Sequence, residues 1–340
     1  MHSLELLQEL VSLPGPPGQE DLVRGALALH VQQMGLDSQT DAKGNLIVRL
    51  GKGGKAKVVV TAHMDEIALQ VKQIAPDGAI KVAPLGGIFP WKLGEGPVTV
   101  MAPSGNFEAI LSFGSIHTES PLSPAKRAKT DVLTWDMATV LTGLGLEGLV
   151  RKGVRPGTRV VVSTRRRELT RMGDFVAGYF LDDRADLVSW LLALKELKDE
   201  PIDVAFVATT SEEVGGEGAQ YFLGQERPDF CIALELGPSV PDAPVAITSH
   251  PTVWVTDAYA SMPPFLMETL DKASASTGIG LQYQALSRGG SDASCSAAKG
   301  LCAHPITLGL PMENSHGYEI IHPKSMESLA ELTVALVKAL

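Results

Sequence analysis

Apolar residues recur at helical spacing in the first part of the chain. Between Ser3 and Met34 the pattern is interrupted at Pro14 to Gly18, where prolines and glycines cannot continue a helix. We therefore predict two helices before the first strand. Two short β-branched runs follow at Asn45 to Arg49 and at Lys57 to Thr61, separated by a turn at Gly51 to Lys55. They predict a hairpin or two neighbouring strands.

The pattern changes between Ile67 and Asp174, where short alternating segments are broken by glycine and proline. Ile80 to Ala83, Gly96 to Met101 and Thr158 to Ser163 are examples. Such segments are typical of strands in a small β domain. We expect residues 67–174 to form an inserted, β-barrel-like domain.

Beyond the insertion, predicted helices and strands alternate. Helices are expected near Arg184 to Leu197, Gly216 to Leu223, Pro264 to Thr277 and Ser325 to Ala339, and strands at Asp203 to Ala208, Phe230 to Leu234 and Ala303 to Leu308. This alternation indicates an α/β fold with a mostly parallel sheet and helices on both faces. We assign residues 1–66 and 175–340 to that domain.

Composition narrows the class of function. The chain has 340 residues, of which 44% are hydrophobic and 20% charged, as in ordinary globular proteins. The formal net charge of -10 would repel nucleic acid and anionic membranes at long range. Because neither a signal peptide nor a run of about 18 apolar residues is evident, we expect no membrane span and a cytoplasmic location.

The cysteines are odd in number and lack paired spacing. Cys231, Cys295 and Cys302 therefore predict reduced thiols and neither a disulfide framework nor a thiolate metal site.

An imidazole and a carboxylate follow the buried-strand run Val58 to Ala62. His63 and Asp65 are two residues apart, so on an extended chain they face the same side, and Asp65 could orient the ring of His63. Ligand sites in open α/β sheets collect at the carboxyl ends of strands. The alternative for this motif alone is a strand end with solvated charges.

Further carboxylates lie where the chain changes direction. Asp182 opens a predicted helix and could bridge two cations with its two oxygens. Glu212 and Glu213 follow a strand and point in different directions, so that one could bind a metal while the other acts as a base. Glu235 ends another strand. Taken singly, each could be a helix cap or a solvated charge.

A second imidazole follows the last apolar strand. His316 lies in a loop that ends in glycine and His322 is a nearby rival, and their chemistry alone does not choose between them. Two imidazoles and several carboxylates without a cysteine suit two zinc-like ions with one shared carboxylate. Two ions about 3.5–4 Å apart activate a water and polarise a carbonyl, as in aminopeptidases.

Four blocks of sequence carry a family resemblance. They are Ala62-His63-Met64-Asp65-Glu66, Leu181-Asp182-Asp183-Arg184, Glu212-Glu213-Val214-Gly215 and Gly289-Gly290-Ser291-Asp292-Ala293. In this order they resemble the glutamyl aminopeptidase family of co-catalytic metallopeptidases, which includes the tetrahedral aminopeptidases. The resemblance spans nearly the whole chain. It implies a zinc-peptidase-like fold and a metal-dependent aminopeptidase that acts on short peptides.

The resemblance also implies roles for the candidate residues. The implied metal ligands are His63, Asp182 and Glu235 for one ion and Asp182, Glu213 and His316 for the other, with zinc favoured and cobalt or manganese as alternatives. His316 is preferred to His322 because the family's last ligand lies five residues beyond a proline, here Pro311.

The same resemblance implies Glu212 as the general base and Asp65 as the residue behind His63. It further implies a homo-oligomer, commonly a dodecamer, with the insertion providing contacts. Two rival functions stay open. One is a two-metal deacylase or amidohydrolase of small amides, for which Glu235 in place of the family's usual aspartate and the unusual loop around His316 argue, and the other is a non-catalytic binding protein with the same fold.

Overall fold

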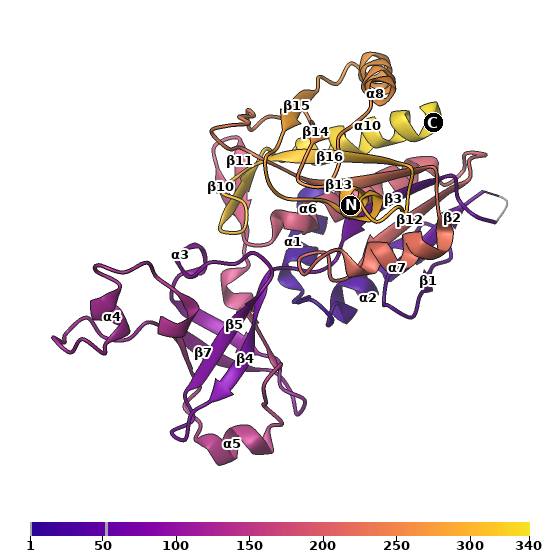
Figure 1. Ribbon diagram of the computed structural model, residues 1–340. Coiled ribbons are helices and arrows are strands. Elements are labelled where there is room, and N and C mark those ends of the chain that lie inside the picture. Colours follow the sequence, from indigo (N-terminus) through magenta and orange to yellow (C-terminus); the bar gives the residue numbers. More distant parts are fainter. Residues whose placement is uncertain (1, 52–53) are drawn as a thin grey trace. The chain divides into compact units, whose positions relative to one another are not determined.

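The computed structural model describes residues 2–51 and 54–340 and divides them into two compact units (Figure 1). The first unit contains the described residues of Met1–Glu66 together with Leu169–Ser315 and Glu319–Leu340, and the second contains Ile67–Glu168 and His316–Tyr318. The turn predicted at Gly51 to Lys55 includes residues 52 and 53, which lie outside the described residues.

The first unit is built on one mixed sheet, in which the structure describes eleven strands. In spatial order the main path is β1 (Gln39–Thr40), β2 (Leu46–Leu50), β12 (Val204–Thr209), β3 (Val58–His63), β13 (Phe230–Pro238), β16 (His304–Glu313), β17 (Glu319–Ile321), β11 (Phe175–Gly178) and β10 (Thr170–Met172). Off this path, β14 (Thr252–Thr256) pairs with β16 and with β15 (Gln282–Ala285).

Along its main path, the sheet is parallel at its centre and antiparallel toward both ends. Strand β3 runs parallel to β12 and β13, and β13 runs parallel to β16. The pairs β1 with β2, β2 with β12, β16 with β17 and β11 with β17 are antiparallel. The predicted α/β class is confirmed, with the parallel pairing concentrated in the strands that carry the candidate site.

The predicted pairing of the first two longer strands is wrong. Strand β12 lies between β2 and β3, because Phe206 pairs with Val48 on one side and with Val60 on the other. Every residue of β3 is buried. A strand buried on both faces takes a central position with partners on both edges, and here that requirement outweighs the short connection to β2.

Helices cover both faces of this sheet, as predicted. One face packs on α1 (Ser3–Ser12), α2 (Asp21–Gln33), α6 (Leu181–Leu197), α8 (Pro264–Thr277) and α10 (Ser325–Ala339), and the other on α7 (Glu217–Glu226) and α9 (Asp292–Ala297). Val58 and Val60 join the first core, and Val59 joins the second, because successive strand side chains face opposite sides. No described helix is long and apolar enough to cross a membrane.

The second unit contains a closed barrel. Its strands, in order around the barrel, are β4 (Ala68–Ile74), β5 (Ile80–Leu85), β8 (Thr139–Leu141), β7 (Phe107–Ser112), β6 (Gly96–Val100) and β9 (Arg159–Val162). Short helices α3 (Pro90–Leu93), α4 (Pro124–Arg127) and α5 (Leu146–Arg151) and the 3-10 turn Trp135–Met137 lie in its connections, and a second 3-10 turn, Thr164–Arg166, follows β9. The expected barrel-like β structure is thus present.

Candidate metal centre

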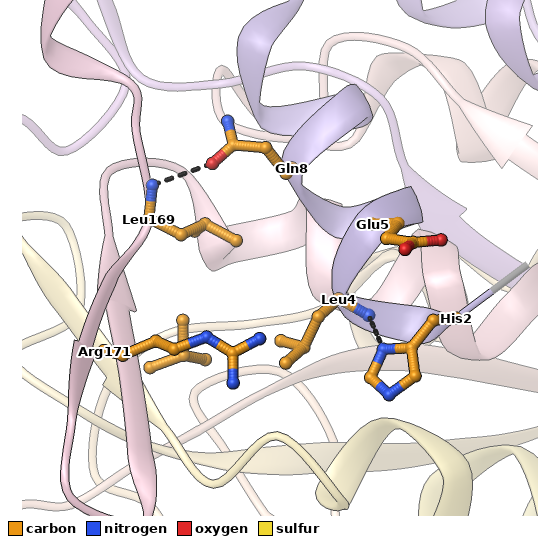
Figure 2. Close-up of a pocket in the computed structure, with 7 residues that line it drawn as sticks. His2, Leu4, Glu5, Gln8, Leu169 and Arg171 are labelled. Atoms are coloured by element: carbon orange, nitrogen blue, oxygen red, sulfur yellow. Dashed lines mark hydrogen bonds between the residues drawn. The ribbon is translucent and has the colours of Figure 1, made fainter.

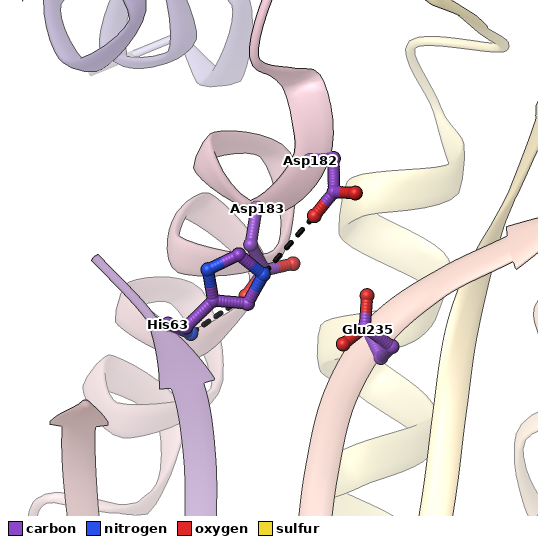
Figure 3. Close-up of side chains that lie close together, drawn as sticks. All are labelled: His63, Asp182, Asp183 and Glu235. Carbon is purple, nitrogen blue, oxygen red and sulfur yellow. Dashed lines mark hydrogen bonds and ion pairs between the residues drawn. The ribbon is translucent and has the colours of Figure 1, made fainter. Parts of the chain in front are cut away.

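His63 is the last residue of the buried strand β3 and lies at its carboxyl end (Figure 3). Its ring is buried, with Nε2 3.0 Å from Asp182 Oδ1. On the other side, Nδ1 lies 3.1 Å from the backbone carbonyl oxygen of Asp65 and 3.5 Å from Asp65 Oδ1. Contacts to both ring nitrogens therefore fix the orientation of the imidazole.

Four side chains from three segments converge at this point (Figure 3). His63, Asp182, Asp183 and Glu235 each offer one ligand atom, and these atoms lie within 4.8 Å of one another. All four residues are buried. The sequence predicted His63, Asp182 and Glu235 as a group, and the structure brings them together. It adds Asp183, which was quoted in the Leu181 to Arg184 block without a role.

Asp182 and Asp183 reach the cluster because the first turn of α6 is irregular. Both residues have non-helical backbone angles, and the preceding Phe180 has a φ of 63°. The amide of Asp182 donates to Glu319 Oε2 at 3.0 Å, and Asp183 Oδ2 accepts the amide hydrogen of His63 at 2.7 Å. The backbone of Asp182 and the carboxylate of Asp183 are therefore held by different partners at the start of α6.

The cluster carries more negative than positive charge. Burial raises the pKa of Glu235 well above its ordinary value, and the charge of Asp182 adds to the shift. Burial also raises the pKa of Asp183, followed by repulsion from Asp186. Burial opposes protonation of His63, but Asp183, Asp182 and Asp65 outweigh it and raise its pKa well above the usual value.

The donor set fits a divalent cation. One imidazole and three carboxylates supply the nitrogen and oxygen ligands that borderline metals such as zinc accept. Asp183 Oδ1 is buried without a hydrogen-bond donor. Since like charges that are buried together are costly unless a cation neutralises them, these residues can hold a metal.

Asp65 links the His63 region to the paired glutamates. Its carboxylate accepts the amide hydrogen of Glu212 on Oδ1 at 2.9 Å and that of Glu213 on Oδ2 at 3.1 Å. Sequence reasoning placed Asp65 behind His63 and missed its two bonds to the glutamate backbone. These bonds could be predicted from the sequence only if the pairing of β12 with β3, which places Thr209 opposite His63, were already known.

Glu212 and Glu213 lie at the carboxyl end of β12 and are half-buried. A carboxylate oxygen of Glu213 lies within 4.8 Å of one from Asp182. Burial raises the pKa of Glu212 well above its ordinary value. His63 opposes that shift, whereas Asp292 and Glu213 add to it.

Asp292 is a further acidic residue without an assigned role in the sequence. It begins α9, and its Oδ2 accepts a hydrogen bond from the Thr209 hydroxyl at 2.6 Å. Burial raises its pKa to about 6. It therefore adds to the excess of buried negative charge behind Glu212.

The two candidate histidines of the last loop occupy different surroundings. His316 follows β16 and is one of three residues of that loop that belong to the second unit. There, its Nδ1 lies 3.0 Å from the carbonyl oxygen of Gly87. His322 lies beyond β17 with its ring edge-on to Phe175, and its Nδ1 accepts the amide hydrogen of Lys324 at 3.3 Å.

A separate cavity of about 550 Å³ lies in the first unit (Figure 2). Its lining consists of His2, Leu4, Glu5, Gln8, Leu169, Arg171 and Val176. The amide of Leu169 donates to Gln8 Oε1 at 2.9 Å across its wall. None of the candidate site residues lines this cavity, so it is distinct from the metal centre.

Comparison with known families gives one extended match. A model of the family described as M42 glutamyl aminopeptidase matches residues 44–332. Lysyl aminopeptidase of Pyrococcus furiosus is 26% identical over 99% of this chain and 97% of its own length. Glutamyl aminopeptidase of Lactococcus lactis is 24% identical over 94% of this chain and 91% of its own.

Solved structures agree with this match. An aminopeptidase from the archaeon Desulfurococcus kamchatkensis has a TM-score of 0.86 and 26% identity, covering 98% of this chain and 94% of that one. The TET1 peptidase of Pyrococcus horikoshii, described as able to assemble into a tetrahedron or a large octahedral shell, has a TM-score of 0.87 and 26% identity. That match covers 98% of this chain and 99% of the other.

Proposed function

Because the chain belongs to the M42 glutamyl aminopeptidase family, and is thus an aminopeptidase and a hydrolase, we propose that it uses two metal ions to remove N-terminal residues from short peptides. The observation that carries the proposal is the buried group of His63, Asp182, Asp183 and Glu235, whose ligand atoms lie within 4.8 Å of one another. Such an excess of buried carboxylate suits a cation-dependent hydrolase.

Asp182 is the shared ligand in this proposal. With His63 and Glu235 it holds one ion, and with Glu213 it contributes to a second, zinc being favoured over cobalt or manganese. Two such ions, when bound, acidify the attacking water and polarise the scissile carbonyl. Support for the shared role comes from the position of Asp182, within 4.8 Å of ligand atoms from both His63 and Glu213.

His316 completes the second set of ligands. It lies in the loop between β16 and β17, which pair with each other at Met312 and Ile321. Three residues later, Glu319 accepts the amide hydrogen of Asp182. His316 is preferred over His322 because it lies five residues beyond Pro311, the spacing of the last ligand in the family that the sequence resembles.

Glu212 acts as the general base. Its amide is fixed by Asp65, and burial raises the pKa of its carboxylate above the ordinary value, which makes it a stronger proton acceptor. In this role it takes a proton from the attacking water and delivers it to the leaving amine. Asp65 holds the backbone of both glutamates and thereby positions the base beside its metal-binding neighbour.

We also propose that copies of this chain associate into a homo-oligomer. The support is the likeness to the TET1 peptidase, which can assemble into a tetrahedron or an octahedral shell.

Substitution of the neighbouring glutamates tests the mechanism. Glu212→Gln keeps the shape of the side chain but cannot accept a proton, so kcat should fall by about 10²–10⁴-fold with unchanged metal content. Glu213→Gln weakens a metal ligand, so excess metal should restore part of its activity. The measurement is a metal titration of both variants followed by peptide hydrolysis rates.

The controls separate the roles and the rival function. Recovery of Glu212→Gln by excess metal, with Glu213→Gln inactive at full occupancy, would reverse the two assignments. Full activity of both variants would refute the site. Parallel assays with a free and an N-acetylated peptide distinguish an aminopeptidase, which requires the free amine, from a deacylase.

A further inference from the structure

The chain segment that carries the paired glutamates is held by side chains along its backbone. Besides the two bonds to Asp65, the amide of Ser211 donates to Glu20 Oε1 at 3.2 Å, and the amide of Thr210 donates to Asn45 Oδ1 at 3.0 Å. Four consecutive amides thus donate to buried side chains. Asn45 and Asp65 adjoin β2 and β3, the strands on either side of β12, whereas Glu20 directly precedes α2 and belongs to neither strand.

Ser211, the residue before the proposed base, has a backbone conformation that residues with a Cβ atom rarely adopt. Its φ is 55°, in the left-handed region. Such a conformation persists only where the surrounding structure determines it. Here the two peptide planes that flank Ser211 are both held, because Glu20 accepts the amide hydrogen of Ser211 and Asp65 accepts that of Glu212. Together these two carboxylates fix the direction in which the chain reaches the base.

The Glu20 side chain is itself fixed in place. It is only 3% exposed, which leaves no surface for a substrate, and its Oε1 also accepts the amide hydrogen of Gly18 at 2.7 Å. The same loop is tied to the end of β3, because the carbonyl of Gly15 accepts the amide hydrogen of Glu66 at 3.0 Å. Burial raises the pKa of Glu20, and the charge of Asp65 adds to the shift. Since a buried carboxylate needs hydrogen bonds to be tolerated, the amides that it accepts show what it holds.

We propose that Glu20 is a positioning residue that orients the Glu212 carboxylate through the amide of Ser211. This inference rests on the proposed function, in which Glu212 is the general base. Without the bond to Glu20, Ser211 relaxes toward the commoner backbone regions, and the peptide plane that leads to Glu212 rotates. A reacting group displaced by about 1 Å costs on the order of 10²-fold in rate. Asp65 still holds the amides of both glutamates, so the metal content is retained.

The test compares Glu20→Ala with Glu20→Gln in the full-length, metal-loaded protein, on the tripeptide that the unaltered protein cleaves fastest. Glu20→Ala should lower kcat about 10–100-fold, with KM and metal content per chain nearly unchanged. Glu20→Gln keeps an oxygen that accepts the Ser211 amide hydrogen and should retain most of kcat. In the Glu20→Ala background, Ser211→Gly should recover part of kcat, because glycine adopts the left-handed conformation without a steric clash.

The matched control is Glu226→Ala, which removes another buried carboxylate of the first unit. Glu226 is 6% exposed, accepts the amide hydrogen of Ala56 and pairs with Arg49 at 2.9 and 2.8 Å. Ala56 precedes the amino end of β3, whereas His63 lies at its carboxyl end. Glu226→Ala should lower the urea midpoint of unfolding as Glu20→Ala does, and it should leave kcat unchanged. An equal loss of kcat in both variants would reduce the effect of Glu20 to stability and overturn the proposal.

Three other results would overturn the proposal: a rise in KM at constant kcat, loss of metal from Glu20→Ala, or recovery by neither Glu20→Gln nor Ser211→Gly. If Glu20→Ala does not fold, Glu20→Asp provides the test. Its shorter side chain withdraws the oxygen from the Ser211 amide and should lower kcat about 3–10-fold, and an unchanged kcat would overturn the proposal. Failure of the unaltered protein to cleave any peptide, or full activity of Glu212→Gln, would instead refute the proposed function itself.

Discussion

Two buried charged groups in the first unit are built in opposite ways. The guanidinium of Arg184 donates to Glu66 Oε2 at 2.9 Å and to the backbone carbonyls of Leu10, Met64 and Asp65. Both side chains of that ion pair are fully buried. The nearby group around His63 instead joins three carboxylates to one imidazole. One group is balanced in charge and the other is not.

The difference separates a structural group from a functional one. A buried ion pair whose hydrogen bonds are satisfied fixes the segments that it connects, and no further ion is required to neutralise it. Buried carboxylates that repel one another raise their pKa values and destabilise the folded chain until protons or a cation neutralise them. The group around His63 therefore destabilises the folded chain when no ligand is bound. Such a cost is expected where a cation binds.

The largest effect should come from removing the shared carboxylate. Asp182→Ala should abolish activity and release both metals, because the variant loses the oxygen atoms that each ion needs. Metal analysis of the purified variant, with Asp199→Ala as an exposed carboxylate control, provides the measurement. Two equivalents of metal per chain in Asp182→Ala would show that Asp182 is not the bridge.

The next effect is a change in the free energy of unfolding that should differ between the two groups. Glu66→Gln removes the carboxylate charge that faces the buried Arg184 guanidinium and should lower the free energy of unfolding by about 3–5 kcal/mol. Glu235→Gln removes one repelling charge and should leave the unfolding free energy of the chelated protein unchanged or higher. Urea unfolding in the presence of a chelator measures both, and equal losses would remove the distinction between the groups.

The smallest effect should be a pH dependence of stability in the chelated protein. Asp292, with a folded pKa of about 6 against about 3.8 unfolded, binds its proton more tightly in the folded state. Stability is therefore gained as the pH falls from about 8 to about 5, by on the order of 1 kcal/mol from Asp292 alone. His63 and Glu235, whose pKa values are also raised, act in the same direction.

Saturating metal provides the control for this pH dependence. A bound cation would neutralise the same carboxylates, so the gain at low pH should disappear or reverse as protons compete with the metal. The measurement is the free energy of unfolding, by heat or urea, across the pH range with and without metal. Stability of the chelated protein that rises with pH would contradict an excess of buried negative charge.

The candidate site was largely predictable because its residues sit at the ends of recognisable strands. His63 and Glu235 follow apolar runs, and parallel neighbours bring such ends together. Asp183 was not predictable, since it has the same chemistry as Asp182 and reaches the cluster only through the irregular start of α6. The two bonds from Asp65 to the glutamate amides likewise depend on which strands are neighbours.

The position of β12 between β2 and β3 also determines when parts of the chain can form during synthesis. The barrel strands find all their partners between Ala68 and Val162, so the barrel can close before β12 has been translated. Strand β3 has no β12 partner until Val204–Thr209 emerges from the ribosome, and its apolar side chains stay unburied until then. During that interval its apolar side chains are open to aggregation, and chaperone binding there would protect the nascent chain.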